Sequence, residues 1–279
     1  MKVVQKTFFW FRHLNFDVGL ASVASSIMAF KVFGVSIHFS FWIVLFISTW
    51  SIYAIDHIID GIMENKLRSA TRYVFYFKHR KILLVFILIL GLFNIFLVIN
   101  YLNLQIIYAS LIMITLTIVY FFHIQKLIPR LPFSKDILSS LLFTIGIWIF
   151  PVFMIPNIPS FKQTEIMALF FMAVLLNILM YSIHDKKLDK DYKYVTLITK
   201  RGDNLVFRLI KTIFISSLIV LIVLLQSDRR MIVASAIVLS FIQLLHLIIL
   251  LKYSYFFKNE RFFKIGNLIF ILPIIFLFL

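Results

Sequence analysis

The chain has 279 residues, of which 62% are hydrophobic and only 14% are charged, and its formal net charge is +16. A soluble domain of this length does not need so much apolar surface, so the composition indicates a membrane protein. Cysteine is absent, which excludes disulfide bonds, thiolate metal sites and a cysteine nucleophile.

Residues 1–26 begin with the positive charge that is typical of a secretory signal. However, Arg12 and Asp17 interrupt the hydrophobic core of such a signal, and the apolar run continues past the small residues at which cleavage would occur. We therefore expect a retained first helix rather than a cleaved leader.

Polar interruptions divide the rest of the chain into runs of roughly 20 mostly apolar residues, the length that an α-helix needs to cross a bilayer. The sequence thus predicts an all-α integral membrane protein in which residues 1–279 form a single domain of nine transmembrane helices. The predicted helices cover residues 17–36, 38–60, 82–100, 102–122, 137–155, 165–184, 205–226, 231–251 and 262–279.

The distribution of basic residues predicts the orientation of these helices. If the N-terminus is cytoplasmic, all but four of the 28 lysines and arginines lie on the cytoplasmic side. The four on the outside are Lys31, Lys162, Arg229 and Arg230. Cytoplasmic loops normally carry this excess of Lys and Arg, so the charge reflects topology. We expect no nucleic-acid partner, because no basic stretch lies outside the predicted loops.

Two pairs of aspartates end the second and the sixth predicted helices. Asp56 and Asp60 lie in SIYAIDHIIDG, and Asp185 and Asp189 lie in HDKKLDKD. In each pair the i, i+4 spacing places both carboxylates on one face of the helix, one turn apart. Both helices are even-numbered, so we expect both pairs on the cytoplasmic side.

Two such pairs facing one another would form an anionic site rich in oxygen atoms. Mg²⁺ is the expected occupant, because it prefers oxygen ligands and is held by a few carboxylates together with substrate phosphates. Several carboxylates do not remain ionised together in a low-dielectric setting without cations. The predicted metal ligands and catalytic residues are Asp56, Asp60, Asp185 and Asp189.

His57 and His184 flank the two pairs, but we do not expect either to bind a metal. No HxxxH or HExxH pattern is present, and His57 points about 100° away from Asp56 around the helix. We interpret both histidines as interfacial polar residues, for which a hydrogen bond to a neighbouring carboxylate is one option.

The aspartate motifs resemble those of the UbiA superfamily of intramembrane prenyltransferases. Members of that family have nine helices, a cytoplasmic active site and aspartate-rich motifs after helices 2 and 6. The first family motif is N-x-x-x-D-x-x-x-D, and Asp56, Asp60 and the trailing Gly61 match it. Ile52 replaces the motif asparagine, and Tyr53 replaces the adjacent acid.

The second family motif continues from D-x-x-x-D to a glycine, a Ser or Thr and a further glycine. Asp185 and Asp189 match its acids, and Thr196 and Gly202 fall at the expected offsets. Lys193 replaces the first glycine. The resemblance covers essentially the whole chain, and its second motif is the more specific of the two.

The resemblance implies transfer of a prenyl group from a polyprenyl diphosphate to an aromatic or other lipophilic acceptor. Mg²⁺ and basic residues would stabilise the departing diphosphate. The basic residues proposed for this role are Arg72, Lys126, Lys186 and Lys193. The cytoplasmic loops 61–81 and 185–204 are the candidate cap that excludes water. The enzyme would lie in a bacterial or archaeal-type cell membrane with its active site facing the cytoplasm.

Aromatic side chains near these motifs are candidate linings for an allylic cation, which an aromatic face stabilises. They are Trp50, Tyr53, Tyr120 and Trp148. Tyr120 and Lys126 also resemble the Tyr…Lys element that precedes helix 5 in the family. Aromatic residues make up 17% of the chain, so we expect an ordinary packing or lipid-facing role for most of them.

Two other interpretations stay open. A transporter would line its pathway with carboxylates, but its sites usually lie near the bilayer midplane on broken helices, whereas these acids lie at helix ends. The second interpretation is a catalytically inactive family member that binds a phosphorylated lipid. It stays open because Ile52 removes an amide oxygen from the first motif.

Overall fold

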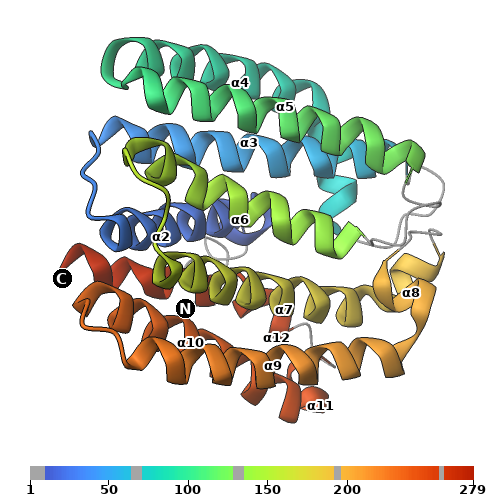
Figure 1. Cartoon of the computed structure of the whole chain (residues 1–279). Helices are drawn as coiled ribbons and strands as arrows, with labels where there is room; N and C mark the ends of the chain where they lie inside the picture. The colour runs from blue at the N-terminus through green and yellow to red at the C-terminus, as the bar shows by residue number, and fades with distance from the viewer. Residues whose placement is uncertain (1–9, 64–70, 128–134, 192–195, 258–260) are drawn as a thin grey trace, which may run out of the picture. The chain divides into compact units, whose positions relative to one another are not determined.

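The computed structural model describes residues 10–63, 71–127, 135–191, 196–257 and 261–279, and these residues form only helices and connections (Figure 1). Eight of the helices described are long and apolar enough to cross a membrane. They are α2 (Phe16–Phe33), α3 (Ser40–Met63), α4 (Thr71–Tyr101), α5 (Leu104–Leu127), α6 (Lys135–Met154), α7 (Phe161–Asp191), α9 (Asp203–Leu225) and α10 (Arg230–Leu251). This confirms the prediction of an all-α chain with the helices of a multi-span integral membrane protein.

Four shorter elements follow α7 in the chain. They are α8 (Leu197–Arg201), α11 (Tyr253–Phe257), α12 (Arg261–Ile265) and the 3₁₀ helix η1 (Leu268–Leu277). The ninth predicted span, 262–279, corresponds to α12 and η1, and η1 is apolar but only 10 residues long. Pro273 lies inside η1 and lacks the backbone N–H that a regular helix uses. The ninth transmembrane span therefore stays a prediction.

Two helices extend well beyond the predicted spans. α4 and α7 have 31 residues each, whereas the predictions were 82–100 and 165–184. Their extra turns, before the apolar run in α4 and after it in α7, are rich in Lys and Arg. These residues favour helix almost as strongly as apolar residues do, so the helix is longer than the hydrophobic run. The predicted loops 61–81 and 185–204 are therefore partly helical, and the second contains the short helix α8.

The chain divides into two compact units. The first consists of Met1–Ala24 and Ile37–Asn103, and the second of Ser25–Ser36 and Leu104–Leu279. One boundary falls inside α2, and another falls in the turn between α4 and α5. The first aspartate pair, on α3, belongs to the first unit, and the second pair, on α7, belongs to the second unit.

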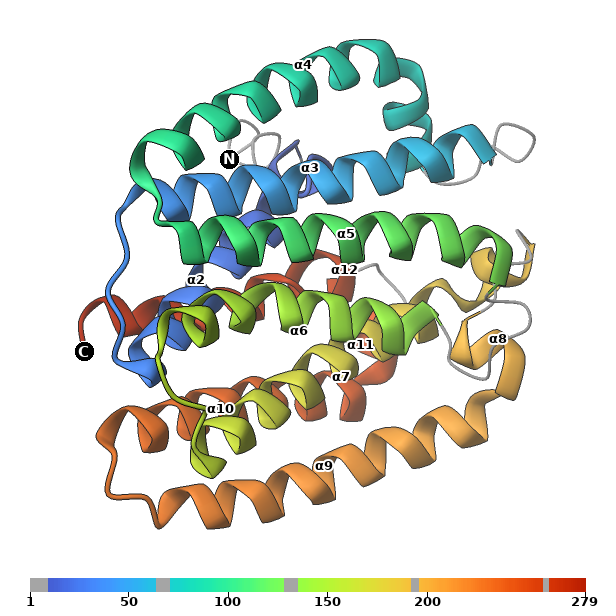
Figure 2. The same ribbon diagram turned by 45° about the horizontal axis from the view of Figure 1, so that its top comes forward.

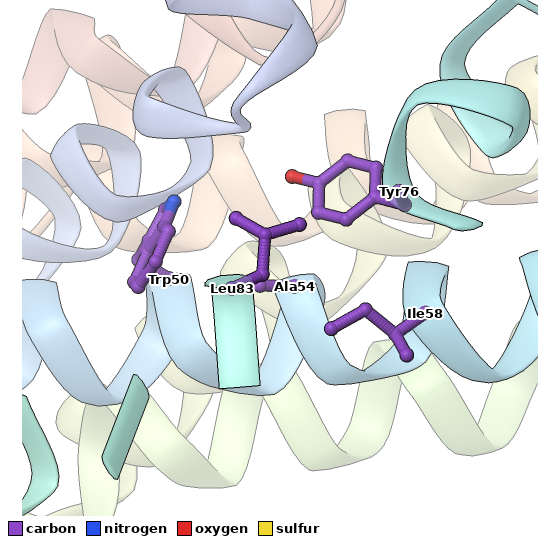
Figure 3. Packing of buried hydrophobic residues seen from close by; sticks show 5 residues of the cluster. All are labelled: Trp50, Ala54, Ile58, Tyr76 and Leu83. Atoms are coloured by element: carbon purple, nitrogen blue, oxygen red, sulfur yellow. The ribbon is translucent and has the colours of Figure 1, made fainter. Parts of the chain in front are cut away.

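In the first unit, α3 and α4 pack together along a continuous hydrophobic core (Figure 3). Trp50, Ala54 and Ile58 recur every four residues, so they lie along one face of α3. Tyr76 and Leu83 of α4 reach over this row (Figure 3). Ala54 is completely buried, and a small side chain at such a position lets two membrane helices approach closely.

In the second unit, α7 is the central helix and packs against α6, α9 and α10 (Figure 2). Its side chains are buried nearly all round, as expected for a helix in the interior of a bundle; Leu169 and Leu176 are 0% exposed. Polar side chains also join it to α10. Gln243 donates to the Leu169 carbonyl at 3.3 Å, and His246 Nε2 lies 3.2 Å from Asn177 Oδ1. These two contacts hold α7 against α10 at Leu169 and at Asn177.

Candidate functional site

The first cluster consists of Asp56, His57 and Asp60 in the last turns of α3. One ligand atom of each, a carboxylate oxygen or a ring nitrogen, lies within 4.8 Å of the others. His57 and Asp60 are each 6% exposed, and Asp56 is half-buried. His57 Nδ1 is 3.9 Å from Asp56 Oδ2, which is too long for a hydrogen bond. Acidic clusters also occur without an ion, so this grouping alone does not establish a metal site.

Tyr76 packs against His57 of the first cluster, and Asn15 forms a hydrogen bond with Tyr76. The ring of Tyr76 packs edge-on against His57, with centroids 5.2 Å apart. Asn15 Nδ2 donates to the Tyr76 hydroxyl at 3.0 Å, and Asn15 has a φ of 57°, a left-handed conformation that asparagine tolerates better than most residues. This hydrogen bond connects the segment before α2 to α4, at the tyrosine that packs against His57. No motif in the sequence points to Asn15 or Tyr76.

The second cluster contains Asp185 and Asp189 in the last turns of α7, and both side chains are half-buried. His184 Nδ1 lies 2.7 Å from Asp185 Oδ1. A carboxylate oxygen only accepts, so Nδ1 is the donor. A hydrogen bond to a neighbouring carboxylate was one option for both histidines, and this contact confirms it for His184.

Burial raises the pKa of the Asp189 carboxyl from 3.8 to about 7. The negative charges of Asp185 and Asp136 also raise this pKa, whereas a hydrogen bond from Thr196 and the charge of Lys135 lower it. Burial and a nearby like charge both disfavour the ionised carboxylate. The second cluster therefore favours either a proton on Asp189 or a cation beside it.

Asp136, in the first turn of α6, is a buried carboxylate next to this cluster, and it is 3% exposed. Its Oδ1 accepts a hydrogen bond from Ser182 Oγ at 2.5 Å, and its Oδ2 accepts one from the backbone N–H of Leu197 at 2.6 Å. No motif in the sequence singles out Asp136. An aspartate at the start of an apolar helix is also what the helix dipole favours, so its sequence carries no distinct signal.

Thr196 and Gly202, the remaining matches to the second motif, flank the short helix α8. Thr196 is the N-cap, and its hydroxyl accepts from the backbone N–H of Thr199 in a capping box. Gly202 connects α8 to α9 with φ 81° and ψ 171°, a conformation that residues with a Cβ rarely adopt. The residues matched to the motif therefore shape the turn on either side of α8.

The four basic residues proposed to bind diphosphate have different positions. Lys186 forms an ion pair with Asp203 in the first turn of α9, at 2.5 Å. Arg72 lies in the first turn of α4 and Lys126 in the last turn of α5, but their side chains lie outside the described residues. Lys193 lies wholly outside the described residues. Only Lys186 is thus placed, and its partner Asp203 was not anticipated.

The aromatic candidates are mostly built into the packing. Trp50 is 2% exposed and Trp148 is 0% exposed, which confirms the packing role expected for such residues. Tyr53 is half-buried. The Tyr120 hydroxyl lies 2.7 Å from Ser139 Oγ, and this hydrogen bond joins α5 to α6.

The described helices and the two clusters define the chain as a multi-span integral membrane protein with an aspartate pair in each of two long apolar helices. No family model, curated protein or solved structure matches the chain.

Proposed function

We propose that the chain is a Mg²⁺-dependent intramembrane prenyltransferase of the UbiA type. It would transfer a prenyl group from a polyprenyl diphosphate to an aromatic or other lipophilic acceptor. The observation that carries the proposal is the repeated i, i+4 aspartate pair in the last turns of α3 and α7. Carboxylates near the hydrocarbon region are costly and usually mark a functional site.

The donor set suits Mg²⁺, because both pairs offer carboxylate oxygens, the ligands that this ion prefers. Asp56 and Asp60 would hold it in the first cluster, and Asp185 and Asp189 in the second. A cation bound there would offset the burial and the like charges that raise the pKa of Asp189, since a nearby cation stabilises the ionised carboxylate. Mg²⁺ would supply electrostatic stabilisation of the leaving diphosphate.

The proposed reaction breaks the bond between the allylic carbon and the diphosphate oxygen, and the diphosphate leaves with the electron pair. A nucleophilic carbon or hydroxyl of the acceptor forms the new bond to the allylic carbon, and the acceptor then loses a proton. Basic residues such as Lys186 would bind the diphosphate oxygens with charge-assisted hydrogen bonds. Apolar helices around the site would exclude the water that otherwise captures the cation.

The test supplies purified protein with radiolabelled polyprenyl diphosphates and a panel of aromatic acceptors, with Mg²⁺ or with EDTA. We expect transfer only with a divalent cation, and a loss of about a hundredfold or more in Asp56→Asn and in Asp185→Asn. Asp228→Asn is the matched control, because Asp228 is an exposed acid in the connection between α9 and α10. Cation-independent transfer, or full activity in both cluster variants, would refute the mechanism.

The same assay separates the other interpretations. Mg²⁺-dependent binding of a prenyl diphosphate without product would identify an inactive lipid-binding protein, for which Ile52 in place of the motif asparagine supplies the reason. Uptake into liposomes driven by a cation gradient would identify a transporter. α3 and α7 are continuous helices through both aspartate pairs, unlike the broken helices that usually form transporter sites.

A further inference from the structure

We infer that Asp136 is the positioning residue of the second aspartate pair: its carboxylate fixes the start of α8, and with it Thr196, beside Asp189. The inference deepens the proposed function and rests on it in one respect, namely that Asp185 and Asp189 bind a cation. The link that Asp136 forms between α6, α7 and α8 does not depend on a bound cation and is measured independently of it.

The carboxylate of Asp136 connects three elements of the second unit. From the first turn of α6, its two oxygens accept one hydrogen bond each, from Ser182 of α7 and from the backbone N–H of Leu197 at the start of α8. The distances are 2.5 and 2.6 Å. Asp136 is 3% exposed and Ser182 is 6% exposed, so water does not compete for these bonds. Hydrogen bonds to a buried charged acceptor are among the stronger ones in proteins.

α8 depends on such contacts because it has only five residues. A helix of this length is not stable by itself in water, so tertiary contacts must hold it in place. Leu197 and Ile198 supply apolar contacts, with 6% and 2% of their surface exposed. Asp136 supplies the polar contact to the first N–H of the helix.

The start of α8 also orients Thr196. The Thr196 hydroxyl accepts from the backbone N–H of Thr199 at 3.4 Å and lies 3.2 Å from the Thr199 hydroxyl. The same Thr196 side chain forms a hydrogen bond with the carboxylate of Asp189. Because Thr196 precedes Leu197 directly, a shift of the Leu197 N–H away from Asp136 changes the position of this hydroxyl relative to Asp189.

Three substitutions separate positioning from charge. Asp136→Ala removes both the hydrogen bonds and the charge. Asp136→Asn removes the charge but keeps both bonds, because Oδ1 still accepts from Leu197 and Nδ2 donates to Ser182 Oγ. Ser140→Ala is the matched control, because Ser140 Oγ donates to the backbone carbonyl of Asp136 and not to its carboxylate.

The position of α8 is measured by electron paramagnetic resonance between two spin labels. The chain has no cysteine, so Ile145→Cys on α6 and Lys200→Cys on α8 introduce the only labelling sites, and both residues are exposed. We expect a narrow distance distribution in the otherwise unchanged chain, in Asp136→Asn and in Ser140→Ala. Asp136→Ala should broaden the distribution.

Cation binding is measured with Mn²⁺, a paramagnetic ion that shares the preference of Mg²⁺ for oxygen ligands. The titration uses unlabelled protein that carries Asp56→Asn and Asp60→Asn, so that the second pair is the one tested. We expect Asp136→Ala to weaken Mn²⁺ binding by roughly tenfold or more, as is typical when a residue that orients a metal ligand is lost. Asp136→Asn should weaken it much less, and Ser140→Ala should not change it.

Each contrary result has a definite meaning. An unchanged distance distribution in Asp136→Ala would overturn the inference. Equal weakening of Mn²⁺ binding in Asp136→Asn and Asp136→Ala would show that Asp136 acts through its charge and not through position, which also overturns it. Absence of Mn²⁺ binding before any change at Asp136 would refute the proposed cation site, while the distance measurement would still decide whether Asp136 fixes α8.

Discussion

Lys186 on α7 donates hydrogen bonds to both carboxylate oxygens of Asp203 in the first turn of α9, at 2.6 and 2.5 Å. The two side chains are 33% and 47% exposed. Water screens a pair of this kind, so it contributes no more than about 1 kcal/mol to stability. Because both would bind the Lys186 ammonium group, Asp203 would compete with the diphosphate that Lys186 is proposed to bind.

Removal of this competitor should strengthen diphosphate binding. In Asp203→Asn, Lys186 loses its ion-pair partner, so we expect tighter binding of inorganic diphosphate in the presence of Mg²⁺, measured by calorimetry. Lys186→Gln should weaken the same binding. Thermal unfolding should change little in either variant, because the pair is exposed. Unchanged diphosphate affinity in both variants would remove Lys186 from the proposed site.

The raised pKa of Asp189 predicts how stability depends on pH without divalent cations. The pKa in the folded chain is about 7 and the ordinary value is 3.8, so between these values the folded chain binds more protons than the unfolded chain. The free energy of unfolding therefore falls as the pH rises from about 4 to about 7. Thermal unfolding in detergent with EDTA measures this slope.

Asp189→Asn is the control for the pH dependence, because an amide does not titrate. The part of the slope due to Asp189 should vanish in this variant. Mg²⁺ should have the opposite effect to a proton, since it prefers the ionised carboxylate, and its apparent affinity should rise as the pH approaches 7. An identical pH slope in the two proteins would show that Asp189 titrates at its ordinary pKa.

Gly202 should not tolerate a side chain, for a purely conformational reason. Its φ is 81°, and a Cβ added there would meet no atom within 4 Å. Gly202→Ala therefore adds no clash, and we expect it to cost about 1–3 kcal/mol from backbone strain alone. The measurement is thermal unfolding of the purified variant in detergent.

Gly91 offers a matched control in α4. A Cβ added at Gly91 also meets nothing within 4 Å, but Gly91 lies within a helix, where alanine is favoured over glycine by roughly 0.5–1 kcal/mol. We expect Gly91→Ala to be neutral or stabilising. Equal effects of the two substitutions would contradict the strained connection between α8 and α9.

The hydrogen bond between Asn15 and Tyr76 should contribute measurably to the first unit. Tyr76→Phe removes the acceptor and leaves the Asn15 amide, which is 3% exposed, without that partner. The expected cost is about 1–3 kcal/mol, seen as a lower unfolding temperature. Tyr108→Phe is the control, because Tyr108 is 58% exposed and its side chain is not enclosed by the protein. Equal unfolding temperatures of the two variants would show that the Asn15 contact is not stabilising.

The predicted orientation can be tested with single cysteines, since the chain has none of its own. Lys200 and Arg229 are both exposed, and the sequence places them on opposite sides of the membrane. A maleimide that does not cross membranes should label Arg229→Cys in intact cells and Lys200→Cys only after permeabilisation. The reverse pattern would invert the topology and place the second aspartate pair outside.

The positions of the membrane helices follow from the sequence because hydrophobic length is a local property of the chain. The eight long helices described occupy the first eight predicted spans. The ends of α4 and α7 do not follow in the same way, because basic residues continue a helix beyond the membrane. The i, i+4 placement of each aspartate pair was predictable, since it depends only on helix geometry.

Apart from His184 beside Asp185, the immediate partners of these aspartates were not predictable. His57 stands about 100° from Asp56 around an ideal helix, yet a ring nitrogen of His57 and a carboxylate oxygen of Asp56 and of Asp60 lie within 4.8 Å of one another. Side-chain rotamers and the packing of Tyr76 against His57 decide this grouping. Neither can be read from spacing along one helix.

The sequence by itself determined that this protein consists of long apolar helices suited to a membrane, where eight of them lie, and which helix turns carry the paired carboxylates. Only the tertiary structure decided that Asp136 holds the start of α8, that Lys186 pairs with Asp203, and that burial raises the pKa of Asp189. The physical reason is that hydropathy and helical period belong to single segments, whereas burial, hydrogen-bond partners and local electrostatics arise where several segments meet.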